Sequence, residues 1–215
     1  MTKLAAILLA AGRSRRMGAF KPLLPFGNKT VIRSCIDNLR AAGVENIIVV
    51  VGHRADEIKD HLRDSSVSYA VNDEPESEMS VSIACGVRTL PETTGAVLIA
   101  LTDHPAVSGE VIRLIIEQWR AGARLVVPEH NRRGGHPVLI DSAFRDELLS
   151  LDPERGLKSF FDLHRDSVSR VSVNSPYIAR DMDTWDDYVA LHEEIFGKLP
   201  VIQVSEGPKE GPGRD

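Results

Sequence analysis

The sequence predicts an α/β fold of three layers, α/β/α, in which helices cover both faces of a mainly parallel sheet. Short apolar runs rich in β-branched residues alternate along the chain with segments of helical period, and this alternation is typical of parallel sheets. The 215 residues, of which 42% are hydrophobic, suffice for one well-buried domain and are few for two. We therefore expect a single domain over residues 1–200.

Six apolar runs are expected to form the strands of this sheet, because they are short and are separated by segments with a different period. They span residues 4–9, 46–51, 67–71, 96–101, 125–127 and 168–173.

Four further segments carry the apolar stripe of an amphipathic helix. They span residues 30–42, 108–119, 143–151 and 184–196. In the first of them, Thr30 is placed to cap the helix and Gly43 to end it. The last stretch of the chain, SEGPKEGPGRD, has no apolar residue to bury, so we expect a disordered tail over residues 201–215.

The overall charge argues against a large polyanionic partner. The formal net charge is −5 and the pI is about 5.8, so the chain as a whole does not attract nucleic acid or an anionic membrane. Any polyanion must then be held by a local basic cluster, which points to a small ligand.

The cysteines and the N-terminal run favour a cytoplasmic protein. Cys35 and Cys85 both lie in apolar helical patterns, which is typical of buried core thiols in a reducing compartment. The apolar run over residues 4–11 is too short to span a bilayer and leads into Gly12 and Arg13 rather than into a signal-peptide cleavage site.

The segment LAAGRSRRMGAFK, from Leu9 to Lys21, leaves the first predicted strand and contains two glycines, three arginines and a lysine. Glycines let backbone N–H groups approach phosphate oxygens, while Arg and Lys supply positive charge. The carboxyl end of a strand is also where open α/β sheets bind ligands. The spacing of Gly12 and Gly18 fits neither a GxGxxG nor a Walker A pattern. We predict a phosphate-binding loop, with a solvated basic turn as the alternative.

Carboxylates follow two of the predicted strands. Asp103 comes directly after the run 96–101, and Asp181 and Asp183 follow the last run and precede a helix. Mg²⁺ is usually bound by one or two carboxylates together with substrate phosphates and waters, so these positions suit a metal ligand. Each Asp taken alone could instead be a turn residue or a helix cap.

The loop resembles the signature loop of the MobA-like NTP transferase family, and is most similar to that of molybdenum cofactor cytidylyltransferases. The resemblance covers roughly residues 4–190. It implies a Rossmann-like nucleotidyltransferase fold of the nucleotide-diphospho-sugar transferase type. The implied activity is the Mg²⁺-dependent transfer of a nucleoside monophosphate from an NTP to a phosphorylated acceptor, with release of pyrophosphate. The AAG spelling is similar to the cytidylyl branch and favours CTP. The GHPV segment, over residues 135–138, and the short length of the chain favour molybdopterin as the acceptor.

The resemblance also assigns residues to roles. Arg16 and Lys21 would hold the triphosphate and act in catalysis with Asp103. Asp103 and Asp183 would bind Mg²⁺, or alternatively Mn²⁺, with Asp181 in reserve. The nucleotide-binding residues would be Leu9, Ala10, Ala11, Gly12, Arg13, Ser14, Lys21, Asn72, Ser80, Ser82 and Asp103.

Two other segments are similar to family motifs. In the stretch from Asn72 to Gly86, Ser80 and Ser82 are either nucleotide contacts or ordinary helix caps, and Glu78 stands where the family usually has glycine. The segment GHPV and its preceding arginines lie on the family's acceptor side. The acceptor-binding residues would be Arg133, Gly135, His136 and Pro137. We interpret His136 and His104 as turn-setting residues and expect no catalytic histidine.

Other functions stay open on sequence grounds. Transfer of a guanylyl or other nucleotidyl group to a different acceptor, such as a sugar phosphate, is one. A non-catalytic chaperone that carries a nucleotide or cofactor is another, and the carboxylate of Glu78 favours it. In either case the partners are small molecules, with a transient contact to a molybdoenzyme or its chaperone and none to nucleic acid or membrane.

Overall fold

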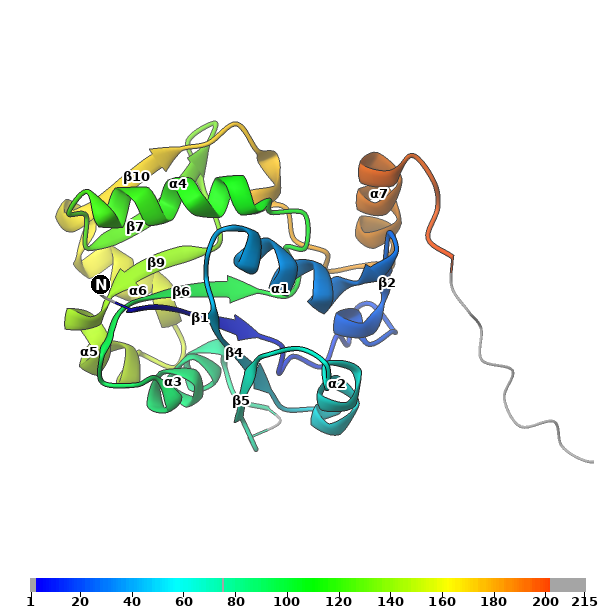
Figure 1. Ribbon diagram of the computed structural model, residues 1–215, viewed down its shortest axis with the longest axis horizontal. Coiled ribbons are helices and arrows are strands. Elements are labelled where there is room, and N and C mark those ends of the chain that lie inside the picture. The colour runs from blue at the N-terminus through cyan, green and yellow to red at the C-terminus, as the bar shows by residue number, and fades with distance from the viewer. Residues whose placement is uncertain (1–2, 75, 202–215) are drawn as a thin grey trace, which may run out of the picture.

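The computed structural model describes residues 3–74 and 76–201 and contains a mainly parallel central sheet (Figure 1). The strand order is β10-β7-β9-β6-β1-β4-β5, and the short strand β8 (Arg133–Gly134) pairs with β7. The bounds of the other strands are β1 (Lys3–Leu9), β4 (Asn46–Val51), β5 (Ser68–Val71), β6 (Thr94–Leu101), β7 (Leu125–His130), β9 (Val138–Asp141) and β10 (Val168–Ser172). All six predicted runs form strands, and the three-layer class is confirmed.

Two strands of the sheet depart from the parallel pattern, and one of them, the short β8, is antiparallel to β7. β9 lies between β6 and β7 and is antiparallel to both, whereas β1 is parallel to β4 and to β6. The segment that contains the GHPV motif therefore enters the sheet in the opposite direction from its neighbours.

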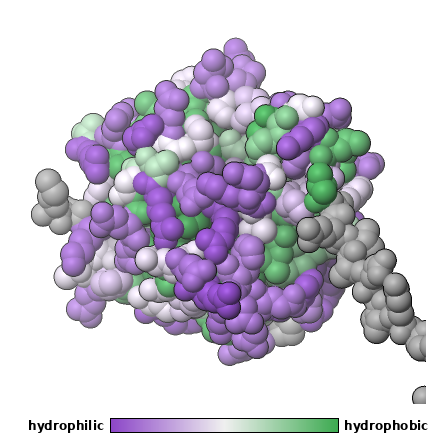
Figure 2. All heavy atoms as spheres, turned by 45° about the vertical axis from the view of Figure 1, so that its right-hand side comes forward, coloured by the Kyte–Doolittle hydropathy of each residue, from purple (hydrophilic) through white to green (hydrophobic). Residues whose placement is uncertain are grey.

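The parallel strands β1, β4, β5 and β6 place their carboxyl ends at one end of the sheet. Figure 2 shows this side of the molecule, on which hydrophilic side chains dominate and surround a small hydrophobic area. A ligand bound there would meet strand ends and loops rather than helix faces.

Two apolar clusters hold the helices against opposite faces of the sheet. In β1, Ala6 and Leu8 belong to one cluster and Ile7 and Leu9 to the other, as the two-residue period of a strand requires. The first cluster includes side chains of α1 (Val31–Ala41), α2 (Ala55–His61) and α4 (Gly109–Arg120); the second includes side chains of α3 (Met79–Thr89), α5 (Arg145–Leu149) and α6 (Gly156–Leu163).

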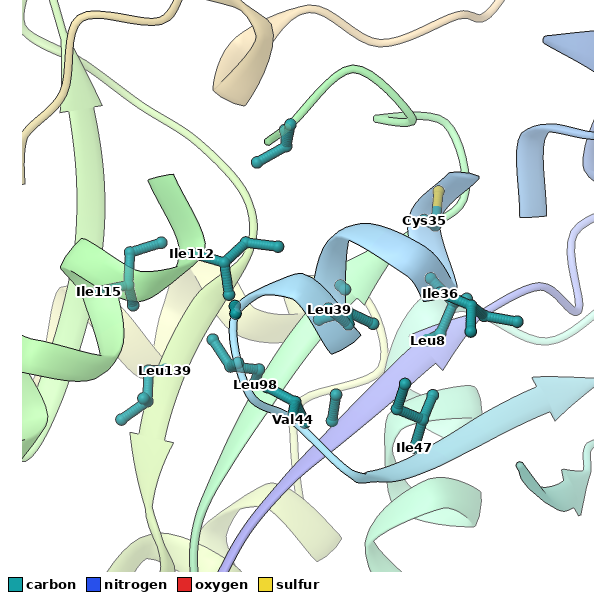
Figure 3. Close-up of a cluster of buried hydrophobic side chains, with 14 of the residues drawn as sticks. Leu8, Cys35, Ile36, Leu39, Val44, Ile47, Leu98, Ile112, Ile115 and Leu139 are labelled. Atoms are coloured by element: carbon teal, nitrogen blue, oxygen red, sulfur yellow. The ribbon is translucent and has the colours of Figure 1, made fainter. Parts of the chain in front are cut away.

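Helix α1 shows how the sequence sets the packing. Ile36 and Leu39 face Leu8 and neighbouring strand residues (Figure 3), and Gly43, with a φ of +86°, follows the end of the helix. Thr30 precedes the helix, but the prediction that its side chain caps it is wrong: the hydroxyl pairs with Nε2 of His61 at 2.8 Å.

A third cluster anchors the loop after β1. Helix α7 (Trp185–Phe196) begins with a capping box between Thr184 and Asp187, and packs beside the hairpin of β2 (Pro25–Phe26) and β3 (Lys29–Thr30). The Tyr188 hydroxyl donates to the Pro25 carbonyl at 2.6 Å. The C-terminal helix thus fixes the far end of the basic loop.

The predictions about one helix, the two cysteines and the C-terminal tail are confirmed only in part or stay untested. The predicted helix over 143–151 is shorter, since α5 spans Arg145–Leu149 after a 3-10 turn (Ser142–Phe144). Both cysteines are free, but only Cys35 is buried and Cys85 is partly exposed. Apart from Val201, the predicted tail lies outside the described residues, and the single-domain boundary stays a prediction. No helix among the described residues is long and apolar enough to span a bilayer.

Candidate active site

A cavity of about 440 Å³ opens at the carboxyl ends of the parallel strands. Backbone hydrogen bonds align these ends: Ala10 N donates to the Val50 carbonyl at 2.9 Å, and Asn72 N donates to that of Val51 at 2.8 Å. The predicted residues that line the cavity are Leu9, Ala11, Gly12, Arg13, Ser14, Arg16, Lys21, Asn72, Ser82, Asp103 and Asp183. Residues from four separate segments of the sequence therefore meet in one place.

The loop after β1 is shaped for close approach of a ligand. Ser14 has a φ of +52°, and its hydroxyl accepts a hydrogen bond from Lys21 N at 3.1 Å, which closes the loop on itself. A Cβ built on Gly12 would meet no atom within 4 Å. The backbone at Gly12 therefore borders open cavity space, as a phosphate-binding loop requires.

Lys21 lies between the two predicted metal ligands. Its Nζ is 3.3 Å from Oδ1 of Asp183 and 3.7 Å from Oδ2 of Asp103, and the residue as a whole is buried. A backbone bond from Met182 N to the Asp103 carbonyl, at 3.1 Å, ties the two carboxylate segments together. Asp181 is exposed and does not line the cavity, so the structure brings Asp183 rather than Asp181 to this centre.

Asp103 is held in its ionised form. Burial alone would raise the pKa of Asp103, but the hydrogen bond from His104 and the positive charge of Lys21 outweigh it and bring the pKa below its usual range. The His104 Nδ1 atom lies 2.8 Å from Oδ1 of Asp103. The role of His104 therefore extends beyond the turn-setting that the sequence suggested.

The arginines of the loop are paired with carboxylates. Arg16 contacts Oδ2 of Asp183 at 2.8 Å, while Arg13 and Arg15 both contact Oε1 of Glu76 at 2.5 Å. The three arginine side chains are between 33% and 73% exposed, so each pair is weak and can exchange for a phosphate.

The segment around α3 places Asn72 and Ser82 at the cavity. Asn72 Nδ2 donates to Ser77 Oγ and to Ser82 Oγ, both at 2.8 Å. Ser80 is buried, its hydroxyl has no hydrogen-bond partner in the described part of the chain, and it does not line the cavity. Neither Ser80 nor Ser82 caps the helix, since the N-cap position is Glu78 and no side-chain cap bond is present.

Glu78 itself is exposed and does not line the cavity. The carboxylate of Glu78, which favoured a non-catalytic chaperone on sequence grounds, is therefore not placed beside the cavity. Glu74 and Glu76 are the acidic residues of this segment that reach the cavity.

The predicted acceptor residues lie apart from the cavity. Arg133 is exposed on β8, Pro137 is buried, and Gly135 is packed so tightly that an added Cβ would stand 2.0 Å from the Ile178 carbonyl oxygen. His136 donates from its backbone N to the same carbonyl at 2.8 Å. None of the four lines the cavity, and their role in acceptor binding stays a prediction.

Sequence reasoning did not single out several residues that line the cavity: Arg15, Pro22, His53, Glu74, Glu76, Ser77, Leu101 and Thr102. His53 and Thr102 could have been found, because each lies within two residues of the end of a predicted parallel strand. Glu74 and Glu76 carried no such signal, since they lie in a loop of otherwise ordinary polar composition.

This arrangement is that of an α/β nucleotidyltransferase, with a basic loop and two carboxylates around a cavity at the strand ends. Residues 6–169 match the MobA-like NTP transferase domain, and the chain belongs to this family of nucleotidyltransferases. The bifunctional protein GlmU of Geobacter sulfurreducens is 32% identical over 180 residues, which are 81% of this chain and 36% of that relative. The chain spans only between 25% and 36% of the length of such bifunctional relatives.

Two other relatives match over nearly their whole length. The nicotine blue oxidoreductase of Paenarthrobacter nicotinovorans is 25% identical over 194 residues, covering 86% of this chain and 94% of that protein. The crystal structure of Rv0371c from Mycobacterium tuberculosis superimposes with a TM-score of 0.81 at 27% identity, covering 89% of this chain and 98% of that one. A structure of Rv0371c in complex with manganese is also similar, with a TM-score of 0.77.

Proposed function

We propose that this protein transfers CMP from CTP to a small phosphorylated acceptor, with molybdopterin favoured, and releases pyrophosphate. The observation that carries the proposal is the position of Lys21 between Asp103 and Asp183, beside the glycine and arginines of the loop. With a bound divalent cation and the loop arginines, such a centre would offset the charge of a triphosphate and hold it in place, which is most of what phosphoryl transfer needs from a protein.

The residues fit a hard divalent cation, Mg²⁺ with Mn²⁺ as the alternative. Two carboxylates converge on one ammonium group, and the pKa of Asp103 is lowered, so an ionised oxygen donor is available. Among residues 3–74 and 76–201, no group of three or more His, Cys, Asp or Glu could hold a metal ion. Substrate phosphates and waters would then complete the coordination, as is usual for Mg²⁺. A bound cation would offset the negative charge on the phosphates. The structure of Rv0371c with manganese supports this proposal.

The base and the acceptor are inferred from the sequence. The spelling LAAG in the loop favours CTP over GTP, and the GHPV segment favours a molybdopterin acceptor. The free cysteines and the small ligand fit a cytoplasmic enzyme that meets a molybdoenzyme or its chaperone transiently.

A second candidate function is the binding of a nucleotide or cofactor without nucleotidyl transfer. One relative that is matched over 94% of its length is named an oxidoreductase, which supports considering a role other than nucleotidyl transfer. The two candidates differ in whether pyrophosphate is formed, and both can be tested on the same protein.

The decisive experiment combines calorimetry with a pyrophosphate assay. Binding of CTP, GTP, ATP and UTP would be measured with and without Mg²⁺, and pyrophosphate would then be followed after addition of molybdopterin. We expect Mg²⁺-dependent CTP binding and pyrophosphate release. CTP binding without release would support the second candidate, and the absence of any NTP binding would overturn both.

The site assignment has its own test in Asp103→Ala. We expect this variant to lose turnover and to keep its melting temperature within a few degrees, because the carboxylate is proposed to act through the metal. An Asp103→Ala variant that retains metal-dependent activity would contradict the assignment.

A further inference from the structure

The side of Asp103 that faces away from the cavity carries a pair of histidines. Oδ2 of Asp103 faces Lys21 at 3.7 Å, whereas Oδ1 is 2.8 Å from Nδ1 of His104. An ionised carboxylate can only accept hydrogen bonds, so Nδ1 of His104 must carry the proton and donate it. The two oxygens of Asp103 are therefore differentiated: one is engaged by a histidine, and one points toward the centre of charge.

His104 is itself confined by His136. The side chain of His104 is 9% exposed, and the ring centre of His136 lies 5.7 Å from its own, with the rings inclined by 54°. Neither histidine lines the nucleotide cavity. Both instead line a separate small cavity of about 20 Å³, whose other walls include Cys35, Leu39 and Ile112. A group in this position cannot contact a nucleotide, but it can restrict the rotation of the group that does.

The Nδ1 atom of His136 is not engaged in a hydrogen bond with the described residues, 3–74 and 76–201. This atom is also shut off from solvent. The backbone that carries the ring is held in place, since His136 N donates to the Ile178 carbonyl at 2.8 Å, and Pro137, which follows, is buried. This backbone is fixed independently of His104, and the ring it carries packs against that of His104.

We propose that His104 and His136 are positioning residues for Asp103: His104 engages Oδ1 so that Oδ2 is presented to the metal, and His136 holds the His104 ring in place. The inference rests on the proposed function, because it takes Asp103 as a metal ligand. It assigns the histidine of the GHPV segment to the metal side of the site rather than to direct contact with the acceptor. Partners of this kind around a metal ligand fix its orientation, and their loss typically weakens metal affinity by about 10- to 100-fold.

The test measures Mn²⁺ binding in the presence of a non-hydrolysable CTP analogue. The EPR signal of free Mn²⁺ reports how much of the metal stays unbound. His104→Phe should weaken Mn²⁺ binding by about tenfold, while His104→Asn, whose amide can donate near the position of Nδ1, should stay within about threefold of the unaltered protein. His104→Leu serves as a second variant if the larger ring does not fit. Binding of the analogue without metal should not change.

The role of His136 is tested by a double-mutant cycle. His136→Ala should weaken Mn²⁺ binding by about threefold, and His136→Phe, which keeps a ring against His104, should restore most of the affinity. In a His104→Phe background, His136→Ala should cost nothing further, since His136 is proposed to act only through His104. Additive losses would overturn this part of the proposal.

A matched control is available on the opposite face of the sheet. His164 Nε2 lies 2.6 Å from Oε2 of Glu147, so His164→Phe breaks a histidine–carboxylate pair that is remote from the cavity. This variant should bind Mn²⁺ as the unaltered protein does. If the unaltered protein binds no Mn²⁺ with the analogue, the proposed function itself fails. If it binds, and folded His104→Phe or His104→Leu binds equally well, only the positioning role is overturned.

Discussion

The loop after β1 and the segment that leads into β9 both contain glycines and basic residues, but they are built in opposite ways. At Gly12 an added Cβ would meet nothing within 4 Å, whereas at Gly135 it would stand 2.0 Å from a carbonyl oxygen. The first glycine borders open space, and the second is required by packing. A glycine beside a basic residue therefore indicates a ligand site only where the backbone is left uncovered.

The charges of the two regions differ in the same way. Lys21 is buried between two carboxylates at the cavity, while Arg133 is exposed on β8 and does not line it. Low solvent exposure strengthens the interaction of Lys21 with an anion, and screening weakens that of Arg133.

The largest expected effect comes from Lys21→Ala. The change removes the buried cation of the centre, so we expect nucleotidyl transfer to fall by about 10²- to 10³-fold, as on loss of a preorganised stabilising group. Arg133→Ala is the matched control and should leave CTP affinity unchanged. Pyrophosphate release and calorimetry measure the two effects. If Lys21→Ala and Arg133→Ala lost CTP affinity to the same extent, the two regions would not differ as described.

The next effect concerns stability. Gly135→Ala places a methyl group against the Ile178 backbone, which cannot move aside by a rotamer change, so we expect a loss of about 3 kcal/mol or more in the free energy of unfolding. Gly134→Ala is the control, because its Cβ would approach no atom closer than 3.2 Å, and the two nearest atoms belong to the side chains of Val127 and Arg170 rather than to backbone. Urea unfolding measures both, and a Gly135→Ala variant of unaltered stability would contradict the packing.

The reverse pattern is expected at the other glycine. Gly12→Ala should leave the unfolding midpoint unchanged and should weaken CTP binding, since the methyl group would occupy space that the ligand needs. Together, the two substitutions separate a glycine that serves the fold from one that serves the ligand.

His136 gives a pH dependence of stability. Burial, together with the neighbouring His104, lowers the pKa of His136 from 6.5 to about 4. Between these values the unfolded chain binds a proton that the folded protein does not, so stability is fully present above pH 6.5 and falls as the pH drops toward 4. The loss from this one group amounts to about 3 kcal/mol.

Urea unfolding at a series of pH values in EDTA would measure this loss. His136→Phe keeps a ring but cannot be protonated, so its stability should fall less steeply between pH 6.5 and 4. His164→Phe provides the control for a partly exposed histidine. A slope for His136→Phe equal to that of the unaltered protein would mean that His136 is not kept neutral by the fold.

The loop after β1 and the segment that leads into β9 also differ in how far they could be predicted from the sequence. The strands and the basic loop could be predicted from the sequence because each depends on residues that are neighbours in the chain. The run 46–51 coincides with β4, and Lys21 lies in the same loop as Gly12. Asp103 could be predicted as a site residue because it directly follows a buried strand.

The contacts of β9 and of Glu76 could not be predicted, because local sequence patterns do not show which distant segments meet. β9 is antiparallel to β6 and β7, and this reversal brings His136 against His104, a contact between residues 32 positions apart. The same holds for Glu76, which meets Arg13 from a loop 63 positions away. Neither residue has a local spacing that would reveal such a contact.

The smallest expected effect concerns this Glu76. Its carboxylate engages Arg13 and Arg15 where a triphosphate would bind, so the ligand must compete with it. Glu76→Gln should therefore tighten CTP binding, but by no more than about fivefold, because the pairs are exposed and each is weak. The gain should shrink as salt is raised, since screening reduces the repulsion that the substitution relieves. Calorimetry at two salt concentrations measures both the gain and its loss. Weaker binding by Glu76→Gln would instead mean that Glu76 contributes to holding the ligand, which would make it part of the site rather than a competitor for it.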